Sequence, residues 1–546
     1  MRFSQILPCA FIALCLASAA STHEGHQHPA GGLERLGTVH FPVSCNAAAR
    51  LEFERGVAML HSFWFEEAGK AFSHVTETDP GCAMGYWGVA MSLYHPLWDP
   101  PDTTALRQGR TAVEKAESVG VQTERERDYL AAVEAFYQDA EKLDHRTRAL
   151  AYEKAMERVY LRYPEDREAA VLYALALDAT ALPTDKTYAN QQKAGAILEK
   201  VFAEEPNHPG VAHYIIHSYD YPPLAGRALS AARSYAKIAP SVPHALHMPS
   251  HIFIRLGLWQ EAIQSNRASA AAAREHAAQA FPGSAWDQQL HAMDYLAYAY
   301  LQRDQGREAK GVLDELDAIQ KAEPESGTSA YAFTAIPARY TLERHRWAEA
   351  ALLTLRPNTF PWSRYRWAEA NLYFARALGA ARAGDGASAR QEVEKLQSLH
   401  DTLVKAAQSY WADEVDIQRR AAAAWLARAE GKNQEAVTLM RSAAELEDAT
   451  EKHPVTPGPI LPARELLGDL LLELNEPGQA LQEFEISLRA SPNRFNGLSG
   501  AARAAQLAGD PEKARTYYAQ LVSLCGNADS TRTELAEART FLAKGQ

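Results

Sequence analysis

The sequence repeats itself with a period of 34 residues along several parts of its length. Alanine recurs at this interval at Ala194, Ala228 and Ala262, and again at Ala480 and Ala514. A constant period of this size is typical of repeat architectures, in which no unit can bury its apolar face alone and each packs against its neighbours. With 546 residues the chain is also too long for one ordinary core. We therefore expect an array of similar units.

Other positions of the unit carry residues of constant type. Gly56, Ala68, Phe72 and Pro80 occupy the 8th, 20th, 24th and 32nd places of one unit. A small residue allows two helices to cross closely, an aromatic ring one turn later fills the space toward the next unit, and proline stops the second helix. The pattern therefore predicts helical hairpins. A second copy places the same residue types at Leu467, Gly468, Ala480, Phe484 and Pro492.

These positions resemble the tetratricopeptide-repeat family, and the chain as a whole resembles exported bacterial members of that family. The resemblance is clearest near residues 49–80, 190–262 and 461–525. It implies an all-α fold, namely a right-handed superhelical solenoid of about eleven or twelve helical hairpins with a concave groove. It also implies a scaffold role, and it implies no reaction. Less regular copies recur around Ala309, Ala350, Ala389 and Ala436.

The N-terminus has the features of a secretory signal peptide. Arg2 precedes an apolar run from residue 6 to residue 16, and small residues follow from Ala17 to Ala20. The run is too short to span a bilayer. We therefore predict that residues 1–20 are removed and that the mature protein is periplasmic or secreted.

The mature chain is expected to begin with a polar, flexible arm over residues 21–45. This arm carries His23, His26 and His28. Cleavage after Ala20 would leave a Ser-Thr-His terminus that suits Cu(II) or Ni(II), whereas a solvated arm without metal is the alternative. The remaining parts are an N-terminal repeat array over 46–305, degenerate hairpins over 306–460 and a C-terminal repeat array over 461–546.

The charge balance argues against nucleic acid as a partner. The formal net charge is −12 at pH 7, so the protein has no large positive field to attract phosphate backbones or anionic lipid surfaces. Beyond the signal peptide, no run of about 18 uncharged apolar residues is present, and no membrane span is expected.

Three cysteines remain after signal removal, in a compartment that favours disulfides. Cys45 and Cys82 fall near the starts of two adjacent first helices in the repeat frame, so we predict a disulfide between them. A Cys/His metal site that includes His40 is the alternative. Cys525 has no evident partner.

Paired histidines occur twice at one repeat interval. "AHYIIHSYD" contains His213 and His217, and "LHMPSHIF" contains His247 and His251. Residues i and i+4 share one face of a helix. The tetratricopeptide resemblance implies that these first-helix places line the concave groove. Apart from a proline, a leucine and an alanine, these two histidines are what the two units share at matched places.

Further polar residues are expected to add to this cluster. Pro249, between the second pair, should kink its helix and free the carbonyl of Ala245. Tyr214 and Tyr298 are candidate hydrogen-bonding residues of the groove. Four residues are possible additional ligands because they occupy similar repeat positions or share a helix face with the paired histidines: His244, His291, Asp294 and Asp220.

The histidine cluster has three interpretations. Four imidazoles with one or two carboxylates suit Zn, Cu, Ni or Fe, and the sequence does not separate these metals. Alternatively, the histidines hydrogen bond a peptide or small-molecule ligand, or form a purely structural network. A peptidase is disfavoured because the glutamate of H-E-x-x-H is missing from both stretches. One ion can bridge neighbouring helices, which lie about 8–10 Å apart, only in a tight groove.

A second repeated pair is found nearer the N-terminus. His61 and His95 are 34 residues apart, and so are Trp64 and Trp98. Packing at hairpin turns is one explanation, and an aromatic extension of the groove is the other. The sequence contains no Gly-rich phosphate loop, no G-x-S-x-G and no Cys-x-x-Cys.

Three functional hypotheses follow. The first is an exported scaffold that binds a protein, peptide or small ligand in the histidine-lined groove, with a bound transition metal. The second is a metalloenzyme in which two of the histidines and Asp294 or Asp220 hold an ion with an open coordination position. The third is a protein-protein assembly scaffold without metal.

Overall fold

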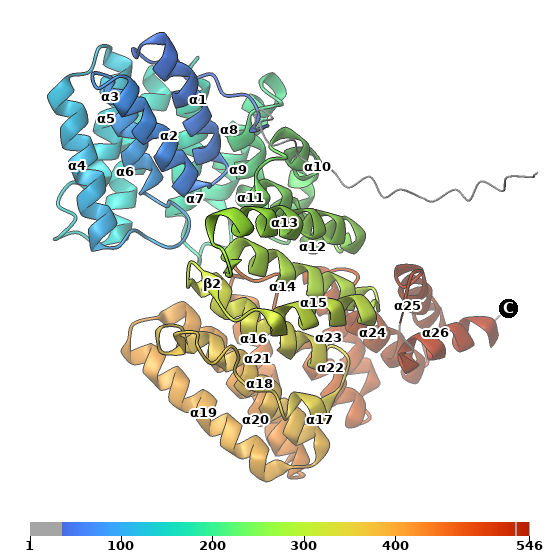
Figure 1. The fold of residues 1–546 in the computed structure, drawn as a ribbon. Helices are drawn as coiled ribbons and strands as arrows, with labels where there is room; N and C mark the ends of the chain where they lie inside the picture. The colour runs from blue at the N-terminus through green and yellow to red at the C-terminus, as the bar shows by residue number, and fades with distance from the viewer. Residues whose placement is uncertain (1–34, 530–531, 545–546) are drawn as a thin grey trace, which may run out of the picture. The chain divides into compact units, whose positions relative to one another are not determined.

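The computed structural model describes residues 35–529 and 532–544, and α-helices make up most of this part of the chain (Figure 1). The predicted all-α repeat fold is confirmed. One short parallel strand pair accompanies the helices, β1 (Ala285–Trp286) and β2 (Ala322–Glu323), with Ala285 opposite Ala322. The predicted signal peptide and the histidines of the arm, His23, His26 and His28, lie outside the described residues.

The helices of the first half have the following bounds: α1 (Ala47–His61), α2 (Phe65–Thr78), α3 (Ala83–Ser92), α4 (Thr103–Val119), α5 (Glu124–Tyr137), α6 (His145–Arg162), α7 (Arg167–Thr180), α8 (Ala189–Glu204), α9 (Pro209–Tyr219), the 3-10 helix η1 (Ala225–Ala228), α10 (Leu229–Ile238), α11 (Pro243–His247), α12 (Pro249–Arg255) and α13 (Trp259–Ala280).

The helices of the second half are α14 (Asp287–Gln302), α15 (Gly306–Ala318), α16 (Gly327–Leu342), α17 (Trp347–Ala350), the 3-10 helix η2 (Trp362–Arg364), α18 (Arg366–Ala383), α19 (Gly386–Lys405), α20 (Ser409–Ala429), α21 (Asn433–Ala449), α22 (Ala463–Glu473), α23 (Pro477–Ala490), α24 (Phe495–Leu507), α25 (Pro511–Leu524) and α26 (Thr533–Lys544).

Side chains just before the helices explain where several of them begin. The Asn46 side chain accepts hydrogen bonds from the first free amides of α1, and Thr123 forms a capping box with Glu126 at the start of α5. Pro209 and Pro243 stand at the first positions of α9 and α11, where a missing N–H costs nothing. The two helices that carry the paired histidines thus begin at equivalent places.

The repeat residues pack as their types predict. The ring of Phe72 lies between Gly56 and Gly88, where an added Cβ would come within 2.9 Å and 2.2 Å of it. Near the C-terminus, Phe484 lies in the same way between Gly468 and Gly500, with corresponding distances of 2.6 Å and 2.3 Å. Glycine is therefore required on the first helix of two successive hairpins so that one aromatic ring can fill the space between them.

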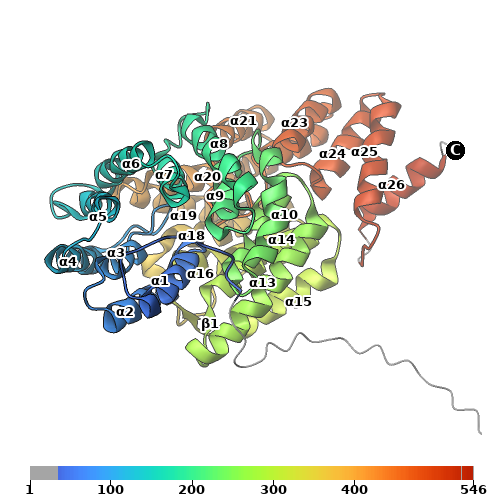
Figure 2. The same ribbon diagram turned by 90° about the horizontal axis from the view of Figure 1, so that it is seen from above.

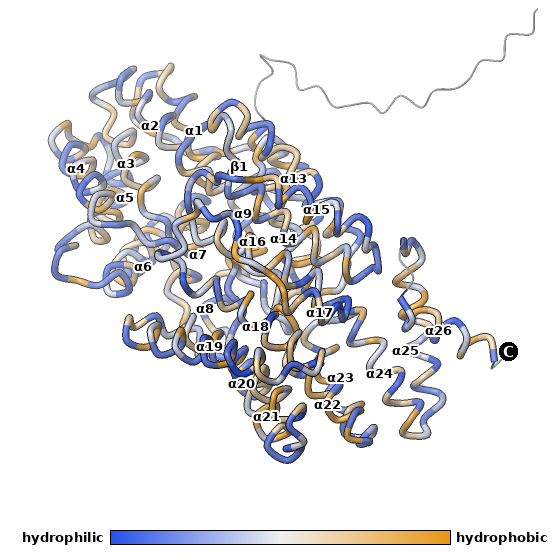
Figure 3. Tube along the Cα trace, turned by 60° about the horizontal axis from the view of Figure 1, so that its bottom comes forward, coloured by the Kyte–Doolittle hydropathy of each residue, from blue (hydrophilic) through white to orange (hydrophobic). Residues whose placement is uncertain are grey.

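Neighbouring hairpins pack in sequence order along most of the chain. Each helix contacts the next one, and first helices also contact each other, as in α16 against α18 and α20 against α22. Hydrophilic and hydrophobic segments alternate along the helices (Figure 3), as expected when each helix turns one apolar face toward its neighbours.

Two helix contacts depart from this order. Helix α1 contacts α9, and α14 contacts α24, although each pair is far apart in the sequence (Figure 2). In a regular solenoid each unit contacts only its neighbours. The contact between α1 and α9 brings residues of α1 beside the helix that carries His213 and His217.

Residues 35–45 differ from the flexible arm predicted for 21–45. Leu36, Phe41 and Val43 are buried in the core, and the Thr38 amide donates to the carbonyl of Asn207 at 2.9 Å. These apolar side chains bury enough surface to hold the segment in place. The described part of the arm is therefore part of the folded body.

The structure joins Cys45 to Cys82 in a disulfide at the starts of α1 and α3. His40, the third member of the alternative Cys/His metal site, is exposed and lies 3.7 Å from Glu54 instead. Cys525 is buried and unpaired with another cysteine.

None of the helices in the described residues combines the length and the apolar character needed to cross a bilayer.

Candidate metal centre

The histidines come from the first helices of three consecutive hairpins: α9, then α11 with α12, then α14. Helix α9 carries His213 and His217, one helical turn apart. The next first helix is divided at Pro249, so that α11 ends at His247 and α12 begins one residue later. Met248, between them, keeps right-handed helical dihedral angles, so the break removes backbone hydrogen bonds without turning the chain away.

The structure gathers six histidines into two groups of three, rather than four around one point. The first triad consists of His213, His217 and His244, and each ring offers one nitrogen within 4.8 Å of the other two. The Nε2 atom of His213 lies 3.0 Å from that of His217 and 3.2 Å from that of His244. All three side chains are largely removed from solvent.

The second triad consists of His247, His251 and His291, with the same spread of ligand atoms. The Nε2 atoms of His247 and His251 are 3.0 Å apart. His291, which comes from α14, packs its ring 4.3 Å from the ring of His247. The two predicted pairs therefore belong to different triads, and His244 and His291, predicted as additional ligands, each complete one triad.

Hydrogen bonds fix the tautomers in the second triad. The amide nitrogen of Asn266 donates to the carbonyl of Ala262, so its oxygen must accept from Nδ1 of His247, at 2.7 Å. Nδ1 of His251 likewise donates to the carboxylate of Asp220, at 3.0 Å. Because a neutral imidazole carries one proton, both Nε2 atoms then hold lone pairs, and these face each other.

A second proton on either ring would relieve this repulsion, but burial opposes it. Burial lowers the pKa of His251 below its ordinary value, although the carboxylate of Asp220 raises it in part. Burial and the neighbouring histidines lower the pKa of His247 still further. The second triad is therefore a set of uncharged nitrogen donors whose lone pairs are suited to bind a cation.

In the first triad, a hydrogen bond of the same kind fixes the tautomer of one ring, that of His213. Nδ1 of His213 donates to the backbone carbonyl of His61 at 2.7 Å, which leaves Nε2 of His213 as an acceptor or ligand. Burial, followed by the neighbouring histidines, lowers the pKa of His213 and His217 well below the ordinary value, and that of His244 to about 3. A hydrogen bond within this triad could satisfy His213, so the second triad gives the stronger argument for a cation.

Both triads border one cavity of about 230 Å³. His217 and His244 of the first triad line it, and so do His251 and His291 of the second. Aromatic and polar side chains form the remaining wall, including Trp98, Asp99, Met248, Gln288, Arg364, Tyr365, Trp367, Trp411 and His453.

Asp220 supports a histidine of the second triad from behind. Helix α9 ends at Tyr219, and Asp220 follows as its C-cap, pointing toward the next unit. Its carboxylate accepts from Nδ1 of His251, from Arg255 at 2.8 Å and from Lys452 at 2.9 Å. Burial alone would raise the pKa of Asp220, but the two cations and His251 hold it well below its usual range.

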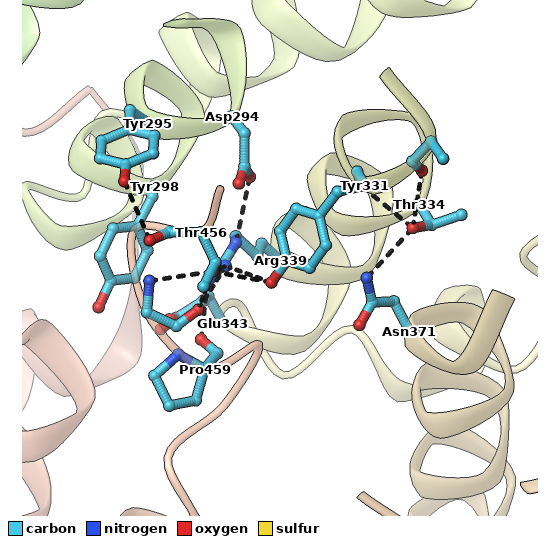
Figure 4. Close-up of polar contacts among 12 residues, drawn as sticks. Asp294, Tyr295, Tyr298, Tyr331, Thr334, Arg339, Glu343, Asn371, Thr456 and Pro459 are labelled. Carbon is cyan, nitrogen blue, oxygen red and sulfur yellow. Dashed lines mark hydrogen bonds and ion pairs between the residues drawn. The ribbon is translucent and has the colours of Figure 1, made fainter. Parts of the chain in front are cut away.

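Asp294, the other predicted carboxylate, lies outside both triads. It is buried on α14 and accepts from Arg339 at 3.2 Å (Figure 4). Its second oxygen has no hydrogen-bond partner, and burial raises its pKa to about 6 in spite of the neighbouring guanidinium.

Arg339 holds the segment that follows α21 against the triads. The fully buried guanidinium donates to the carbonyls of Gly458 and Pro459 at 2.6 Å and to the hydroxyl of Thr456 at 3.0 Å (Figure 4). The hydroxyl of Tyr295 donates to the carbonyls of Pro454 and Thr456, each at 3.0 Å, while its ring packs 4.6 Å from that of His247. We call residues 450–462 the covering segment.

A third buried group, His61, Glu168 and His208, has every ring nitrogen and carboxylate oxygen paired. Nε2 of His61 and Nε2 of His208 each donate to a different oxygen of Glu168 at 2.8 Å. The hydroxyl of Tyr214 lies 3.0 Å from Nδ1 of His61, and the amide of Val211 donates to Nδ1 of His208. This group links α1, α7 and α9 without any need for a metal, and it positions the His61 carbonyl that supports His213.

Tyr298 and His95, also predicted to line the groove, belong to neither triad and make other contacts. Tyr298 accepts from Arg494 at 2.6 Å and packs against Trp259. His95 stacks on Phe65 with ring centroids 4.3 Å apart. Trp64 packs against His276, whereas Trp98 lines the cavity, 5.5 Å from the ring of His217.

Several supporting residues had no signal in the sequence. Asn266 is one asparagine on a long helix, and His208 has no histidine one repeat interval away. Glu168 is one of many glutamates, and no histidine lies close to it in the sequence. Lys452 and His453 fall in a Pro-rich break that indicated only a loop. Their roles depend on which distant segments meet in the folded chain.

Comparison with solved structures finds other helical proteins of similar length. Human IFIT1 in a dimer with m7Gppp-AAAA is 14% identical over 82% of this chain and 90% of that one, with a TM-score of 0.37. Yeast Tom70 is 9% identical over 91% and 96% of the two chains, with a TM-score of 0.34. A chain of the APC/C hetero-tetramer Cut9-Hcn1 is 12% identical over 91% of this chain and 95% of that one, with a TM-score of 0.29.

At these TM-scores the superpositions are loose. No family model matches the sequence. No curated protein matches it either.

Proposed function

We propose that this chain is an exported, metal-binding repeat protein in which each triad holds one transition-metal ion, and that the cavity beside the triads takes a small ligand. The observation that carries the proposal is the pair of Nε2 atoms of His247 and His251, 3.0 Å apart and both without a proton. Two imidazole nitrogens bound at about 2.1 Å to a tetrahedral ion lie about 3.4 Å apart. The triad therefore needs little adjustment to accept an ion.

The surroundings of the triads support the same function. A metal-binding histidine usually donates its other ring N–H to a carboxylate, amide or carbonyl oxygen, which fixes the ring and strengthens the ligand. His213, His247 and His251 donate to a backbone carbonyl, an amide oxygen and a carboxylate respectively. Imidazole-only coordination suits Zn, Cu, Ni or Fe better than Mg or Ca.

Export is supported by two independent features. The N-terminus has the pattern of a signal peptide. The disulfide between Cys45 and Cys82 is of a kind that persists in oxidising compartments and is rare in the cytosol.

A metalloenzyme is the second candidate, and the cavity favours it. Three protein ligands leave a transition metal with at least one position for water or substrate, and both triads border the same cavity. Turnover by metal-loaded protein would separate this candidate from a binding protein. Binding of a protein or peptide partner along the helical array is compatible with either role.

The test is elemental analysis of the full chain, exported to the periplasm and purified without a His tag or chelator. We expect two transition-metal ions per chain, one in the variant H213A/H217A, one in H247A/H251A, and none when all four are replaced. The matched control is His74→Ala, since His74 is an exposed histidine outside the triads. Helical content measured by circular dichroism should be the same in all five proteins.

Two results would overturn the proposal. One is absence of metal from the wild-type protein even after reconstitution with Zn, Cu, Ni and Fe in turn. The other is a metal content that the triad variants leave unchanged, which would place the metal elsewhere in the chain.

A further inference from the structure

Resting on the proposed function, we infer that the two triads form one dinuclear centre, and that this centre binds a small carboxylate whose two oxygens bridge the two ions. The inference rests on the spacing of the triads, on the charge of the ligand set and on the cavity that they share.

The gap between the triads is nearly the same as a gap inside one of them. Within the second triad, the rings of His251 and His291 are 6.2 Å apart. Across the two triads, the rings of His217 and His251 are 6.3 Å apart, and so are those of His244 and His247. Two ions held by these rings would therefore be neighbours, as in two-metal sites, where one ligand contacts both ions.

Helix α11 connects the triads covalently. His244 belongs to the first triad and His247 to the second, and they are three residues apart on one short helix. Neither ion site can move without displacing the ligand of the other. The Pro249 break then places His251 on α12, where it belongs to the second triad and faces His217 of the first.

The ligand set leaves the centre strongly cationic. All six ligands are neutral imidazoles, so two divalent ions would keep their full charge. The nearest carboxylate, Asp220, is already paired with Arg255 and Lys452 behind His251. Asp99 also lines the cavity, but burial disfavours its charged form and raises its pKa, although the neighbouring His95 lowers it in part. A buried centre of this charge favours an anion at its open positions.

The shape of the cavity selects the kind of anion. His217 and His244 face it from one triad, and His251 and His291 from the other, so open positions of both ions meet in one space. A carboxylate has two oxygens that can each bind one ion. The cavity, at about 230 Å³, is larger than a bare anion needs, and Trp98, Trp367 and Trp411 form apolar walls. The expected ligand is a monocarboxylate with an apolar or aromatic body.

The experiment uses the full chain loaded with Cu(II) as a spectroscopic probe and benzoate as the carboxylate. Two coupled Cu(II) ions should give an electron paramagnetic resonance signal far below that expected for two independent ions. The variant H247A/H251A, with one ion, should give the full signal of one Cu(II). Benzoate should shift the visible absorption of the two-copper protein at a concentration at least tenfold lower than for the one-copper variant.

A neutral analogue controls for the apolar walls. Benzamide has the same aromatic body and no carboxylate, so it should bind the two-copper protein at least tenfold more weakly than benzoate.

The outcomes separate this inference from the proposed function. Two bound ions with a full, uncoupled signal would retain the proposed function and overturn the dinuclear centre. Coupled ions that bind benzoate no better than the one-copper variant does, or no better than benzamide, would overturn the bridging carboxylate. Failure to bind copper or any other transition metal would overturn the proposed function itself.

Discussion

The Nε2 atoms of His247 and His251 face each other at 3.0 Å, while Nδ1 of each ring donates a hydrogen bond in another direction. Protein interiors rarely leave two acceptors in contact without a proton or cation between them. The helix spacing of four residues brings the rings together, and Asn266 and Asp220 then fix which nitrogen of each ring is free. The arrangement is thus set by the residues around the triad as much as by the triad.

Asp220→Asn is expected to weaken the second triad and the fold together. The change removes the anion that accepts from His251 and that forms ion pairs with Arg255 and Lys452. We expect metal affinity at the second triad to fall about 10- to 100-fold. Stability should fall by about 3–5 kcal/mol, because two buried cations lose their partner. Metal titration and urea unfolding measure the two effects.

The matched control for this change is Asp178→Asn. Asp178 is a buried carboxylate that accepts from Ser218, and burial raises its pKa well above the ordinary value. It contacts no triad histidine, so metal affinity should be unchanged. Equal loss of metal affinity in both variants would mean that Asp220 acts only through general stability.

The metal-free protein should lose stability as the pH falls from about 6.5. Burial lowers the pKa of the triad histidines, that of His244 to about 3, whereas each has a pKa of about 6.5 in the unfolded chain. Between these values the unfolded state binds more protons, so the free energy of unfolding rises with pH and is lost as the pH falls. Each histidine that takes up a proton contributes about 1.4 kcal/mol per pH unit.

Thermal unfolding at pH 7, 6, 5 and 4 measures this dependence. The variant H247A/H251A lacks two of the buried rings, so its stability should depend less steeply on pH. The same slope in the variant and the wild type would show that other groups cause the acid destabilisation.

The sequence predicted the parts of the site that depend on regular helix geometry. His213, His217, His247 and His251 were identified because they are spaced by four residues and by one repeat interval. His244 was identified from its position within the repeat unit. The sequence did not predict that these residues divide between two triads. That division depends on the break at Pro249 and on the exact rotation of α11 against α9 and α14, which no periodicity encodes.

The supporting residues were harder to predict for a different reason. His61 comes beside His213 because α1 contacts α9, and Lys452 comes beside Asp220 because the covering segment folds back. Such contacts do not occur between distant units of a regular solenoid. Asp220 was expected on the ligand face of α9, but the helix ends one residue before it and the side chain turns toward His251.

Gly210→Ala should disturb the first triad selectively. A Cβ at this position would lie 2.6 Å from Nδ1 of His61, so the His61 ring or α9 must move. The carbonyl of His61 accepts from His213, so the displacement reaches the triad. We expect a loss of about 1–3 kcal/mol in stability and weaker binding of one metal ion of the two.

The control for this substitution is Gly226→Ala, where an added Cβ meets nothing within 4 Å. Differential scanning calorimetry and metal titration should leave that variant equal to the wild type. Unchanged binding of both ions in Gly210→Ala would contradict the link from His61 to the first triad.

Glu168→Gln should destabilise the fold without removing metal. The carboxylate accepts from both His61 and His208, and a glutamine side chain can accept from only one of them. The other ring then faces an NH₂ group, which costs about 1–3 kcal/mol. We expect a lower melting temperature and an unchanged two ions per chain by elemental analysis. Loss of an ion in this variant would identify His61, Glu168 and His208 as a third metal site.

Arg339→Lys should loosen the covering segment. The guanidinium of Arg339 donates to two carbonyls and the Thr456 hydroxyl in that segment, and a single ammonium group cannot reach all of these acceptors together. We expect a loss of about 2–3 kcal/mol in stability. Because His453 and Val455 of the segment line the cavity, bound metal should also transfer to a chelator at least severalfold faster.

Hydrogen exchange of the amides in residues 450–462 and the rate of zinc transfer to a chelator measure the two effects. The control is Arg344→Lys. Arg344 is half-buried, donates to the hydroxyl of Tyr340 and does not contact the covering segment. Faster exchange in Arg339→Lys with an unchanged rate of zinc transfer would mean that the segment does not limit access to the triads. If both rates rise together, the segment controls how metal and ligand enter the cavity, and the buried arginine is the residue that holds it closed.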